Sequence, residues 1–402
     1  MSESSLNNGR RKFRFDEMAT MVNDRVDDPS KANVNYYVGL EHLDSDSLSI
    51  RRWGSPRDVE ATKLRFRVGD IIFGRRRVYQ RKLGVAHFNG ICSAHAMVIR
   101  AKPEVALPEF LPFFMQSDLF MERAKEISVG SLSPTINWKS LALEEFVLPP
   151  LNEQRRLAKL LSASEWVAET MRRLLTRHKL LRRAAIDALT DNEAWPKVSI
   201  GDVCNMQNGK AFPGTSYDKN GIRLMRPGNL SESGYLTWEP SKTVCLSPEW
   251  EHQASEFVVT PGDVVMNLTA QSLEDGFMGR VCLAREGDRS LLNQRIGRFC
   301  AWRAEALPEF IFRVFQSSRF QAYAIEMCEG SKVKHIFWPY ISRYTFRLAP
   351  VCEQHALVNG LGEIDKLVQR LIERAQMHRR IHLRLLAAIA GRRDTSNPAP
   401  PL

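Results

Sequence analysis

One stretch of this chain is written twice. The segment ALPEFLPFFMQS occupies Ala106–Ser117, and the segment ALPEFIFRVFQS occupies Ala306–Ser317, 200 positions later. The same register continues without a gap to FVLPPLNEQRRL (Phe146–Leu157) and FRLAPVCEQHAL (Phe346–Leu357). A repeat that keeps its register over this length predicts two similar structural units in one chain.

Charge indicates the kind of partner that this chain binds. Its 402 residues carry a formal net charge of +11, which favours a polyanionic partner because neutralised phosphates release counterions. No apolar run approaches the ~20 residues of a membrane helix. The first residues, MSESSLNNGRRKFRF, lack the apolar core of a signal peptide, and the seven cysteines form no Cys-x-x-Cys pair. We therefore expect a cytoplasmic protein without membrane segments or a bound metal.

Each repeat begins with strands and continues with a helix. VGDIIFG (Val68–Gly74) and PGDVVMN (Pro261–Asn267) each indicate a tight turn that leads into a buried strand. In the LPEF segments that follow, the proline suits the first turn of a short amphipathic helix. Strands followed by a helix within about 150 residues predict an α+β domain.

Each repeat ends in a much longer helix. From Asn152 to Leu189 the chain contains neither glycine nor proline, and apolar residues recur every seven positions. The expected seam of this helix combines one heptad position with a companion three residues further on: Leu157, Ser164, Met171, His178 and Ala185, with Leu160, Val167, Leu174, Leu181 and Ala188. The second helix, from Glu353 to about Gly391, offers Leu357, Ile364, Leu371, His378 and Leu385, with Leu361, Val368, Ala375 and Ile389.

Such apolar stripes require a partner, so the helices must pair with each other or with another chain. Antiparallel pairing is the easiest geometry, because the two domains lie at opposite ends of the first helix. We expect an α+β protein in which two similar globular domains are separated by two long helices, paired as an antiparallel coiled coil with pseudo-twofold symmetry. The expected parts are residues 1–151, 152–190, 191–351 and 352–393, followed by a disordered tail at 394–402.

The junction between domain and helix, present twice, resembles the specificity (S) subunit of type I restriction-modification systems. The Pro-Pro-x-x-Glu-Gln junction stands here as Pro149, Pro150, Glu153 and Gln154, and its second copy as Ala349, Pro350, Glu353 and Gln354, with alanine for the first proline. The Gly-Asp strand entry and the LPEF helix also look like that family. The resemblance extends from about Phe13 to Gly391.

This resemblance implies that the two domains are target recognition domains, each reading one half of a bipartite sequence in double-stranded DNA. It implies that the helices fix the spacer between the halves and dock two modification (methyltransferase) subunits. Those partners would bring S-adenosylmethionine and methylate adenine, and motor-nuclease subunits would complete a restriction complex. The S subunit itself would bind no cofactor and would perform no chemistry.

In the first domain, a basic segment follows the buried strand. Arginine suits guanine, and asparagine or glutamine suits adenine, when loops reach a DNA groove. The predicted contacts in GRRRVYQRKLG (Gly74–Gly84) are Arg75, Arg76, Arg77, Tyr79, Gln80, Arg81 and Lys82. Ser133 and Thr135 of VGSLSPTINW (Val129–Trp138) are further candidates, with a plain connecting loop as the alternative. The segment leaves open which side chains read bases and which hold phosphates.

In the second domain, the matching segments carry different side chains. NLTAQSLEDGFMGR (Asn267–Arg280) is nearly neutral, and Asn267, Thr269, Gln271 and Ser272 are its predicted contacts. EGSKVKHIFW (Glu329–Trp338) adds Lys332, Lys334 and His335. The aromatic residues of the LPEF segments, together with Trp138 and Trp338, recur at the same places in both domains, so we expect them in the cores. What repeats is therefore scaffold, and what differs is expected to touch DNA.

Catalytic signatures are few in this sequence. It has no Gly-x-x-x-x-Gly-Lys-Ser/Thr phosphate loop and no Asp/Asn-Pro-Pro-aromatic motif of amino-methyltransferases. Asp70 and Asp263 are explained by Gly-Asp turns. We therefore predict a non-catalytic chain. The competing interpretation is a two-headed scaffold that binds proteins, whose binding would be nearly independent of salt, unlike DNA binding.

Overall fold

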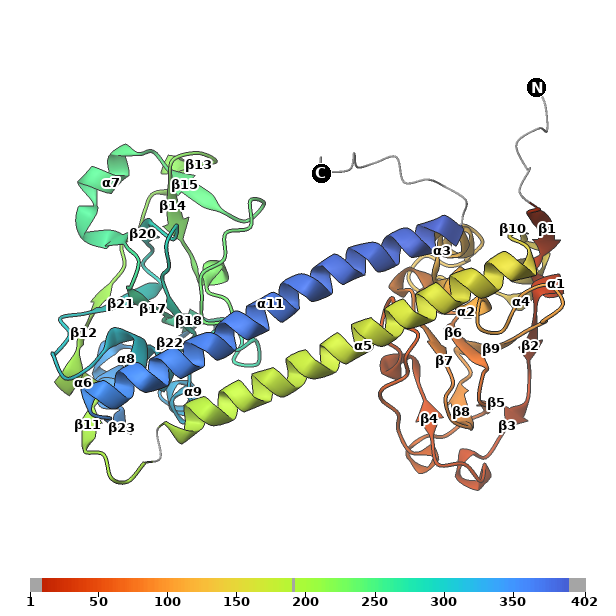
Figure 1. Ribbon diagram of the computed structural model, residues 1–402, viewed down its shortest axis with the longest axis horizontal. Coiled ribbons are helices and arrows are strands. Elements are labelled where there is room, and N and C mark those ends of the chain that lie inside the picture. The colour runs from red at the N-terminus through yellow and green to blue at the C-terminus, as the bar shows by residue number, and fades with distance from the viewer. Residues whose placement is uncertain (1–8, 190–191, 390–402) are drawn as a thin grey trace. The chain divides into compact units, whose positions relative to one another are not determined.

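The computed structural model describes residues 9–189 and 192–389. The chain divides into two compact units: unit 1 comprises the described parts of residues 1–172 and 374–402, and unit 2 comprises those of residues 173–373. Each unit combines one globular head with one half of each of two long helices, α5 (Leu151–Ala188) and α11 (Val351–Ile389), both drawn in Figure 1. The tail predicted at 394–402 lies outside the described residues.

Two four-stranded sheets form the head of unit 1, in the orders β2-β9-β6-β7 and β3-β5-β8-β4. A separate antiparallel pair joins β1 to β10, just before α5 begins. The strands are β1 (Arg11–Arg14), β2 (Ala19–Val22), β3 (Arg25–Val26), β4 (Tyr37–Val38), β5 (Lys63–Phe66), β6 (Ile71–Gly74), β7 (Leu83–Val85), β8 (Gly90–Ser93), β9 (Ala96–Ala101) and β10 (Glu145–Leu148). The helices are α1 (Phe15–Met18), α2 (Leu111–Gln116), α3 (Asp118–Glu126) and α4 (Trp138–Leu143).

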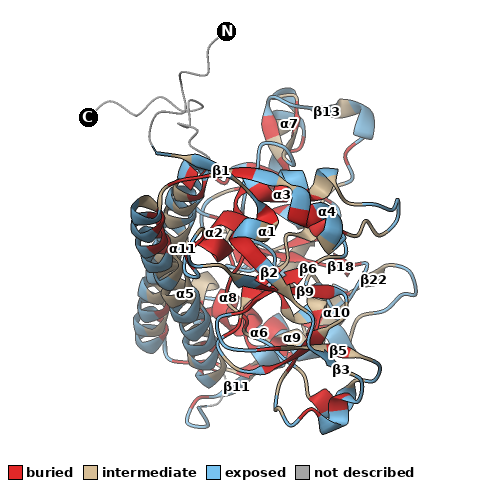
Figure 2. Ribbon diagram, turned by 90° about the vertical axis from the view of Figure 1, so that its right-hand side faces the viewer, coloured by how far each residue is buried: buried red, intermediate tan, exposed pale blue. Residues whose placement is uncertain are grey.

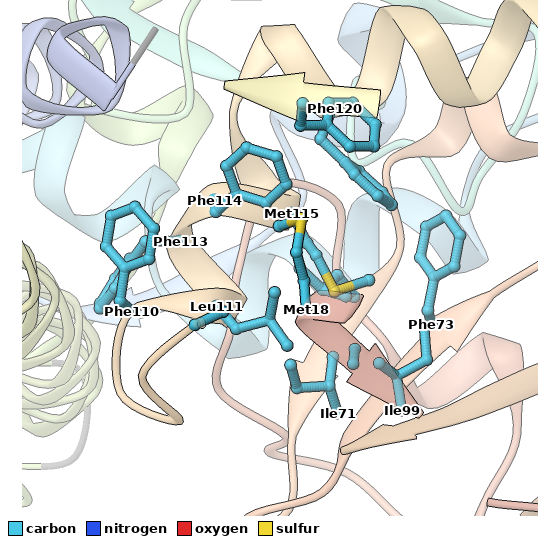
Figure 3. Packing of buried hydrophobic residues seen from close by; sticks show 14 of the residues in the cluster. Met18, Ile71, Phe73, Ile99, Phe110, Leu111, Phe113, Phe114, Met115 and Phe120 are labelled. Atoms are coloured by element: carbon cyan, nitrogen blue, oxygen red, sulfur yellow. The ribbon is translucent and has the colours of Figure 1, made fainter. Parts of the chain in front are cut away.

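Phenylalanines fill the core of this head. The ring of Phe114 lies 5.9 Å from that of Phe120 and 5.2 Å from that of Phe146, each measured between centroids. Figure 3 shows α2 and α3 side chains above Ile71 and Ile99 of the β2-β9-β6-β7 sheet, all within one buried cluster. The core role predicted for the aromatic residues of the first LPEF segment is therefore confirmed.

Unit 2 repeats this plan with three more strands among the described residues, one in its second sheet and two in an additional short pair. Its sheets have the orders β12-β21-β17-β19 and β13-β15-β14-β20-β16, and two short pairs join β11 to β23 and β18 to β22. The strands are β11 (Lys197–Ser199), β12 (Asn205–Asn208), β13 (Tyr217–Asp218), β14 (Ile222–Met225), β15 (Val244–Leu246), β16 (Val258–Val259), β17 (Val264–Asn267), β18 (Thr269–Ala270), β19 (Val281–Leu283), β20 (Ser290–Leu292), β21 (Ile296–Cys300), β22 (Lys334–His335) and β23 (Thr345–Arg347). The helices are α6 (Ile200–Val203), α7 (Glu249–Gln253), α8 (Pro308–Phe315), α9 (Ser318–Glu326) and α10 (Trp338–Ile341).

The strand entries and helix starts follow the sequence signals closely. β6 and β17 are buried along their whole lengths, and the turns before them place Gly69 at φ +89° and Gly262 at φ +92°, where glycine is favoured. α8 begins at Pro308 as predicted, whereas α2 begins at Leu111, so Pro108 precedes the first helix. The predicted turns into buried strands are therefore confirmed, and the proline prediction holds for the second copy alone.

A glutamine at the start of each long helix connects the junction motif to the LPEF segment, which explains why these two motifs repeat together. The Gln154 side chain accepts from Leu107 N at 3.0 Å and donates to the carbonyls of residues 105 and 149. Gln354 makes the same three bonds, accepting from Leu307 N at 2.8 Å and donating to the carbonyls of residues 305 and 349. Both glutamines are buried, so each amide satisfies backbone groups that would otherwise lack partners. The junction thereby fixes each long helix to its own LPEF segment.

The two long helices run antiparallel within each unit. In unit 1 the first half of α5 packs on the last part of α11, where Leu157 and Leu161 share a buried cluster with Leu386 and Ile389. In unit 2 the last part of α5 packs on the first half of α11, where Ile186 shares a second cluster with Leu361, Leu357 and Ile364. The α+β class and the antiparallel pairing of the helices are therefore confirmed.

Of the two heptad positions predicted for the seam of α5, one is correct and the other is wrong. Its first heptad position is correct, because Leu157 is buried and Met171 is half-buried, and in α11 Leu371 and Leu385 are half-buried as well. The companion position fails: the exposed fractions of Leu160, Leu174 and Leu181 are 47%, 38% and 64%, although Val167 is half-buried. Figure 2 shows how much of α5 and α11 remains exposed or intermediate.

The correct companion lies four residues after the first position, at 161, 168, 175, 182 and 189. These numbers are 200 less than those of the companion position in α11, which was predicted correctly at 361, 368, 375 and 389. The leucines at 160, 174 and 181 indicated the wrong face of α5, because this helix has more leucines than its contact with α11 can bury.

Candidate nucleic-acid interface

Three loops meet at one place in the head of unit 1. They are the segment after β6 (75–82), the turn between β8 and β9 (94–95) and the loop before α4 (127–137). Arg75 N donates to His95 O at 3.2 Å, Ile136 N donates to Arg75 O at 2.9 Å, and Arg77 N donates to Pro134 O at 2.8 Å. The two segments predicted from the sequence in this domain are thus neighbours, and we call this arrangement loop cluster 1.

Unit 2 builds the same arrangement from the equivalent segments. Leu268 N donates to Arg295 O at 2.9 Å, and Ile336 N donates to Leu268 O at 3.0 Å. The strands β18 and β22 then join the segments 268–280 and 329–337. Residues 268, 295 and 336 occupy the places of 75, 95 and 136, so the backbone is shared while the side chains differ. We call this arrangement loop cluster 2.

Loop cluster 1 is strongly cationic. Arg76 and Arg77 are exposed, and the Arg76 Nη1 lies 3.1 Å from the Nε2 of His95. Burial lowers the pKa of His95, and the charges of Arg76 and Arg75 lower it further, so this imidazole is neutral at pH 7. Side by side, these arginines can donate to phosphate oxygens or to guanine O6 and N7.

The exposed end of this segment is shaped by two left-handed residues. Arg77 and Arg81, both at φ 52°, bracket the turn Val78–Gln80. Val78 is buried as a consequence, and Tyr79 points outward with 52% of its surface exposed. Gln80 is half-buried. Tyr79 is therefore available to a ligand, while Val78 holds the loop to the core.

Two of the predicted contact residues in this segment, Arg81 and Lys82, are bonded within the fold. The Arg81 guanidinium donates to Asp46, to Asp118 at 2.9 Å and to the Gln116 carbonyl at 2.7 Å. The Lys82 Nζ donates to the Leu40 carbonyl at 2.7 Å. Both cations therefore donate to acceptors within the protein, and these acceptors come from segments that are distant in sequence.

Asn267 and Thr269, which were also predicted to contact DNA, are buried. Asn267 is fully buried, and its Nδ2 donates to the carbonyls of Thr269 at 2.7 Å and Phe277 at 2.8 Å. Thr269 has an exposed fraction of 6% and lies in β18. Asn267 takes the place that Gly74 holds in unit 1, and its amide folds the 268–280 loop back on itself.

The remaining predicted residues differ in accessibility. Gln271, Ser272 and Lys332 are exposed, whereas Lys334 is half-buried. The half-buried His335 ring stacks on that of Phe337, with centroids 6.0 Å apart and planes 9° apart.

In loop cluster 1 the two predicted hydroxyl residues are half-buried. Thr135 donates its hydroxyl to the Ser133 carbonyl at 3.1 Å, and Ser133 Oγ is buried without a partner among the described residues. The Thr135 hydroxyl is therefore engaged within the loop before α4.

Sequence reasoning missed the turn between β20 and β21. Gln294 and Arg295 are exposed there, at the places that Ala94 and His95 occupy in loop cluster 1. The signal was present, because a shift of 200 residues aligns GICSAHA (90–96) with SLLNQRI (290–296). Their amide and guanidinium groups add the donors that the 267–272 segment lacks once Asn267 is buried.

Neither a metal-ligand group nor a membrane-spanning helix is found among the described residues. Within residues 9–189 and 192–389, no group of three or more His, Cys, Asp or Glu side chains is placed to hold a metal ion. Over the same residues, no helix has both the length and the apolar character needed to cross a bilayer.

Comparison with known proteins gives consistent matches, although no known family profile matches the chain. The type I restriction enzyme MjaVIII specificity subunit of Methanocaldococcus jannaschii is 24% identical over 301 residues, which cover 70% of this chain and 68% of that protein. The EcoAI specificity subunit of Escherichia coli is 21% identical over 253 residues, covering 61% of this chain and 41% of that protein.

Solved structures show the same fold. The S subunit of a type I restriction-modification system from M. genitalium has a TM-score of 0.62 at 12% identity, covering 96% of this chain and 98% of that one. A chain from a structural study of complex assembly in a type I system has a TM-score of 0.54 at 21% identity, with 96% and 98% covered. Together with the duplicated heads and paired helices, these matches make the chain a relative, in sequence and in fold, of the specificity subunits of type I restriction-modification systems.

Proposed function

We propose that this chain is the DNA sequence-recognition subunit of a type I restriction-modification complex, with one half of a bipartite target read by each loop cluster. One observation carries the proposal: the two clusters share backbone hydrogen bonds at equivalent residues but present different donors. Arg76 and Arg77 in cluster 1 suit guanine or phosphate, and Gln271 and Gln294 in cluster 2 suit adenine. A common frame with unlike side chains is what reading two unlike half-sites requires.

The chain performs no chemistry in this proposal. Methylation of adenine belongs to two modification subunits, which bring S-adenosylmethionine, and cleavage belongs to motor-nuclease subunits. The relation to type I specificity subunits supports these partners, and the seven unpaired cysteines accord with a cytoplasmic location.

The outer faces of the long helices are the proposed docking surfaces for the modification subunits. Trp166 and Leu160 in unit 1 have exposed fractions of 70% and 47%, and Leu180 and Leu181 in unit 2 have 65% and 64%. Exposed apolar side chains that gather on one surface mark interaction sites, and tryptophan is a favoured anchor in such interfaces. Leu160 and Leu181, which were predicted in the helix seam, are thus assigned to this docking surface.

The test is half-site specificity in the assembled complex. We expect Arg76→Ala to relax base preference in one half of the methylated motif, and Arg295→Ala with Gln294→Ala to relax it in the other. Each lost base contact should cost about 1–3 kcal/mol of discrimination. Arg57→Ala, an exposed arginine of the same head outside the cluster, is the control and should leave the motif unchanged.

Mapping of methylated adenines in DNA treated with each complex gives the readout. The proposal fails if a cluster variant that still assembles with the modification subunits methylates the original motif with its original stringency. The alternative function, a protein-binding scaffold, predicts that binding of the chain to its target is nearly insensitive to salt.

A further inference from the structure

Unit 2 contains a groove of about 760 Å³ where the 231–235 loop of its head faces α5 and α11. Six cationic side chains line it against two acidic ones, a surplus of four positive charges: Lys179, Arg182, Arg183, Arg285, Lys366 and Arg370, against Glu232 and Asp365. The groove lies outside loop cluster 2 and shares no residue with it.

Two of the six cations are already held within the protein. Arg182 pairs with Asp365 at 2.5 Å, and Arg183 donates to Ser318 Oγ at 2.5 Å. These two side chains build the wall of the groove and leave the other four to face a ligand.

The other four cations are exposed and accessible to a ligand. Lys179 and Arg370 have neither an ion pair nor a side-chain hydrogen bond within residues 9–189 and 192–389, and both are exposed. Lys366 pairs with Glu363 at 2.7 Å, but both side chains are 68% exposed, so this pair is weak and exchangeable. Arg285 lies 4.4 Å above the Tyr235 ring, which orients its guanidinium without using its donors.

The equivalent surface of unit 1 has a different character. A shift of 200 residues places Trp166 at Lys366, Thr170 at Arg370 and Glu169 at Gln369. The side chain of Glu169 accepts from Arg51 at 2.9 Å. Lys179 keeps a cationic counterpart in Arg379, but Lys366 and Arg370 have none, so the cations that α11 contributes are specific to unit 2.

The chemistry of the groove favours phosphate over an acidic protein surface. A protein interface is anchored by exposed aromatic or aliphatic side chains, whereas the apolar residues that line this groove, Tyr235, Val368 and Ile372, are all half-buried. Long cationic side chains beside the Ser231 and Ser233 hydroxyls are instead the donors that contact nucleic-acid backbones.

We infer that this groove binds the phosphate backbone of duplex DNA without reading its sequence, as a second contact beside the site that loop cluster 2 provides. The inference rests on the proposed function for its ligand. It adds an affinity-determining surface on the helices of unit 2 to the specificity-determining loops of its head.

The test is a Lys179→Gln, Arg370→Gln double variant in the complex with its modification subunits, bound to a duplex with the cognate motif and to one with a scrambled motif. Two lost phosphate contacts should lower the salt slope of log K by about 1.8, since each contributes about 0.9. At 0.15 M salt this corresponds to a loss of roughly 30-fold in affinity, equal for both duplexes. The matched control is Arg379→Gln with Arg384→Gln, two exposed cations on the unit 1 part of α11, and it should change neither value.

Three results would overturn the inference. The first is an unchanged affinity and salt slope. The second is a loss confined to the cognate duplex, which would make the groove a reader of sequence. The third is normal DNA binding with lost assembly of the modification subunits, which would make the groove a protein-docking surface. Failure of the proposed function is distinct, because it concerns the half-site preference of the loop cluster variants and not the binding of a scrambled duplex.

Discussion

Replacing Asp365 by asparagine probes the buried ionic contact that ties the unit 2 head to both long helices. The Asp365 carboxylate accepts from Arg182 of α5 at 2.5 Å, from Arg313 of α8 at 2.8 Å and from the Tyr235 hydroxyl at 2.7 Å. Exposed side-chain fractions are 8% for Asp365, 3% for Arg313 and 16% for Arg182. Gln316 completes the network by accepting from both arginines, at 2.8 Å and 3.1 Å.

The expected cost follows from this burial. Burial alone would raise the pKa of Asp365, but Arg313 and Arg182 outweigh it and lower the pKa. A lowered acid pKa contributes stability that is present above the unfolded value and is lost as the pH falls through the folded one, so at pH 7 the contribution is complete. Asparagine leaves two guanidinium groups without a counter-charge, one of them almost fully buried. Removing one partner of such a pair costs about 3–5 kcal/mol.

Hydrogen exchange of the amides of α8 and of the 361–372 part of α11 is the suitable assay, because a two-unit chain does not unfold in one step. A loss of 3–5 kcal/mol lowers their protection by about two to three and a half decades. Arg313→Met combined with Asp365→Asn should cost less than the sum of the single variants, since each removes the other's unpaired charge.

Glu165→Gln is the matched control, because Glu165 occupies the equivalent place in unit 1. Burial raises its pKa, the opposite direction from Asp365, so loss of this charge should change stability by less than about 1 kcal/mol. The reasoning is refuted if Asp365→Asn costs less than about 1 kcal/mol, or if the two variants have equal effects.

Three further predictions concern other buried polar groups. Gln354→Ala removes three hydrogen bonds to buried backbone groups and should destabilise unit 2 by about 3 kcal/mol in thermal unfolding, while leaving unit 1 unchanged. Asn267→Ala should accelerate amide exchange in residues 268–280 without affecting β17, because the amide closes that loop; equal exchange rates would contradict this role. Burial and then His378 lower the pKa of His382, which lies 2.9 Å from Ser164 Oγ, so unit 1 should be most stable above pH 6.5 and lose stability as the pH falls. A His382→Gln variant should flatten that pH dependence, measured by urea unfolding between pH 7.5 and about 5.

Much of the architecture could be predicted because the repeated motifs are short, local patterns that return in the same order. The LPEF segments and the junction glutamines recur at a shift of 200 residues, and the Gly-Asp turns recur at a shift of 193. Burial of Phe114 and pairing of Leu157 with the other helix follow from periodicity alone. Aligning the two halves at a shift of 200 residues would also have identified the correct companion position of α5 and the Gln294-Arg295 turn. The many leucines of α5 and the basic segment after β6 favoured other choices.

The sequence by itself determined the α+β class, the duplication and the antiparallel helices, because these depend on periodic apolar positions and on turn residues. Only the tertiary structure decided which polar side chains remain accessible to a ligand. Arg81 is bound by Asp46 and Asp118, and Asn267 is buried against Phe277. The physical reason is that a donor is free only when no acceptor elsewhere in the fold reaches it, and those acceptors come from segments that no local pattern connects.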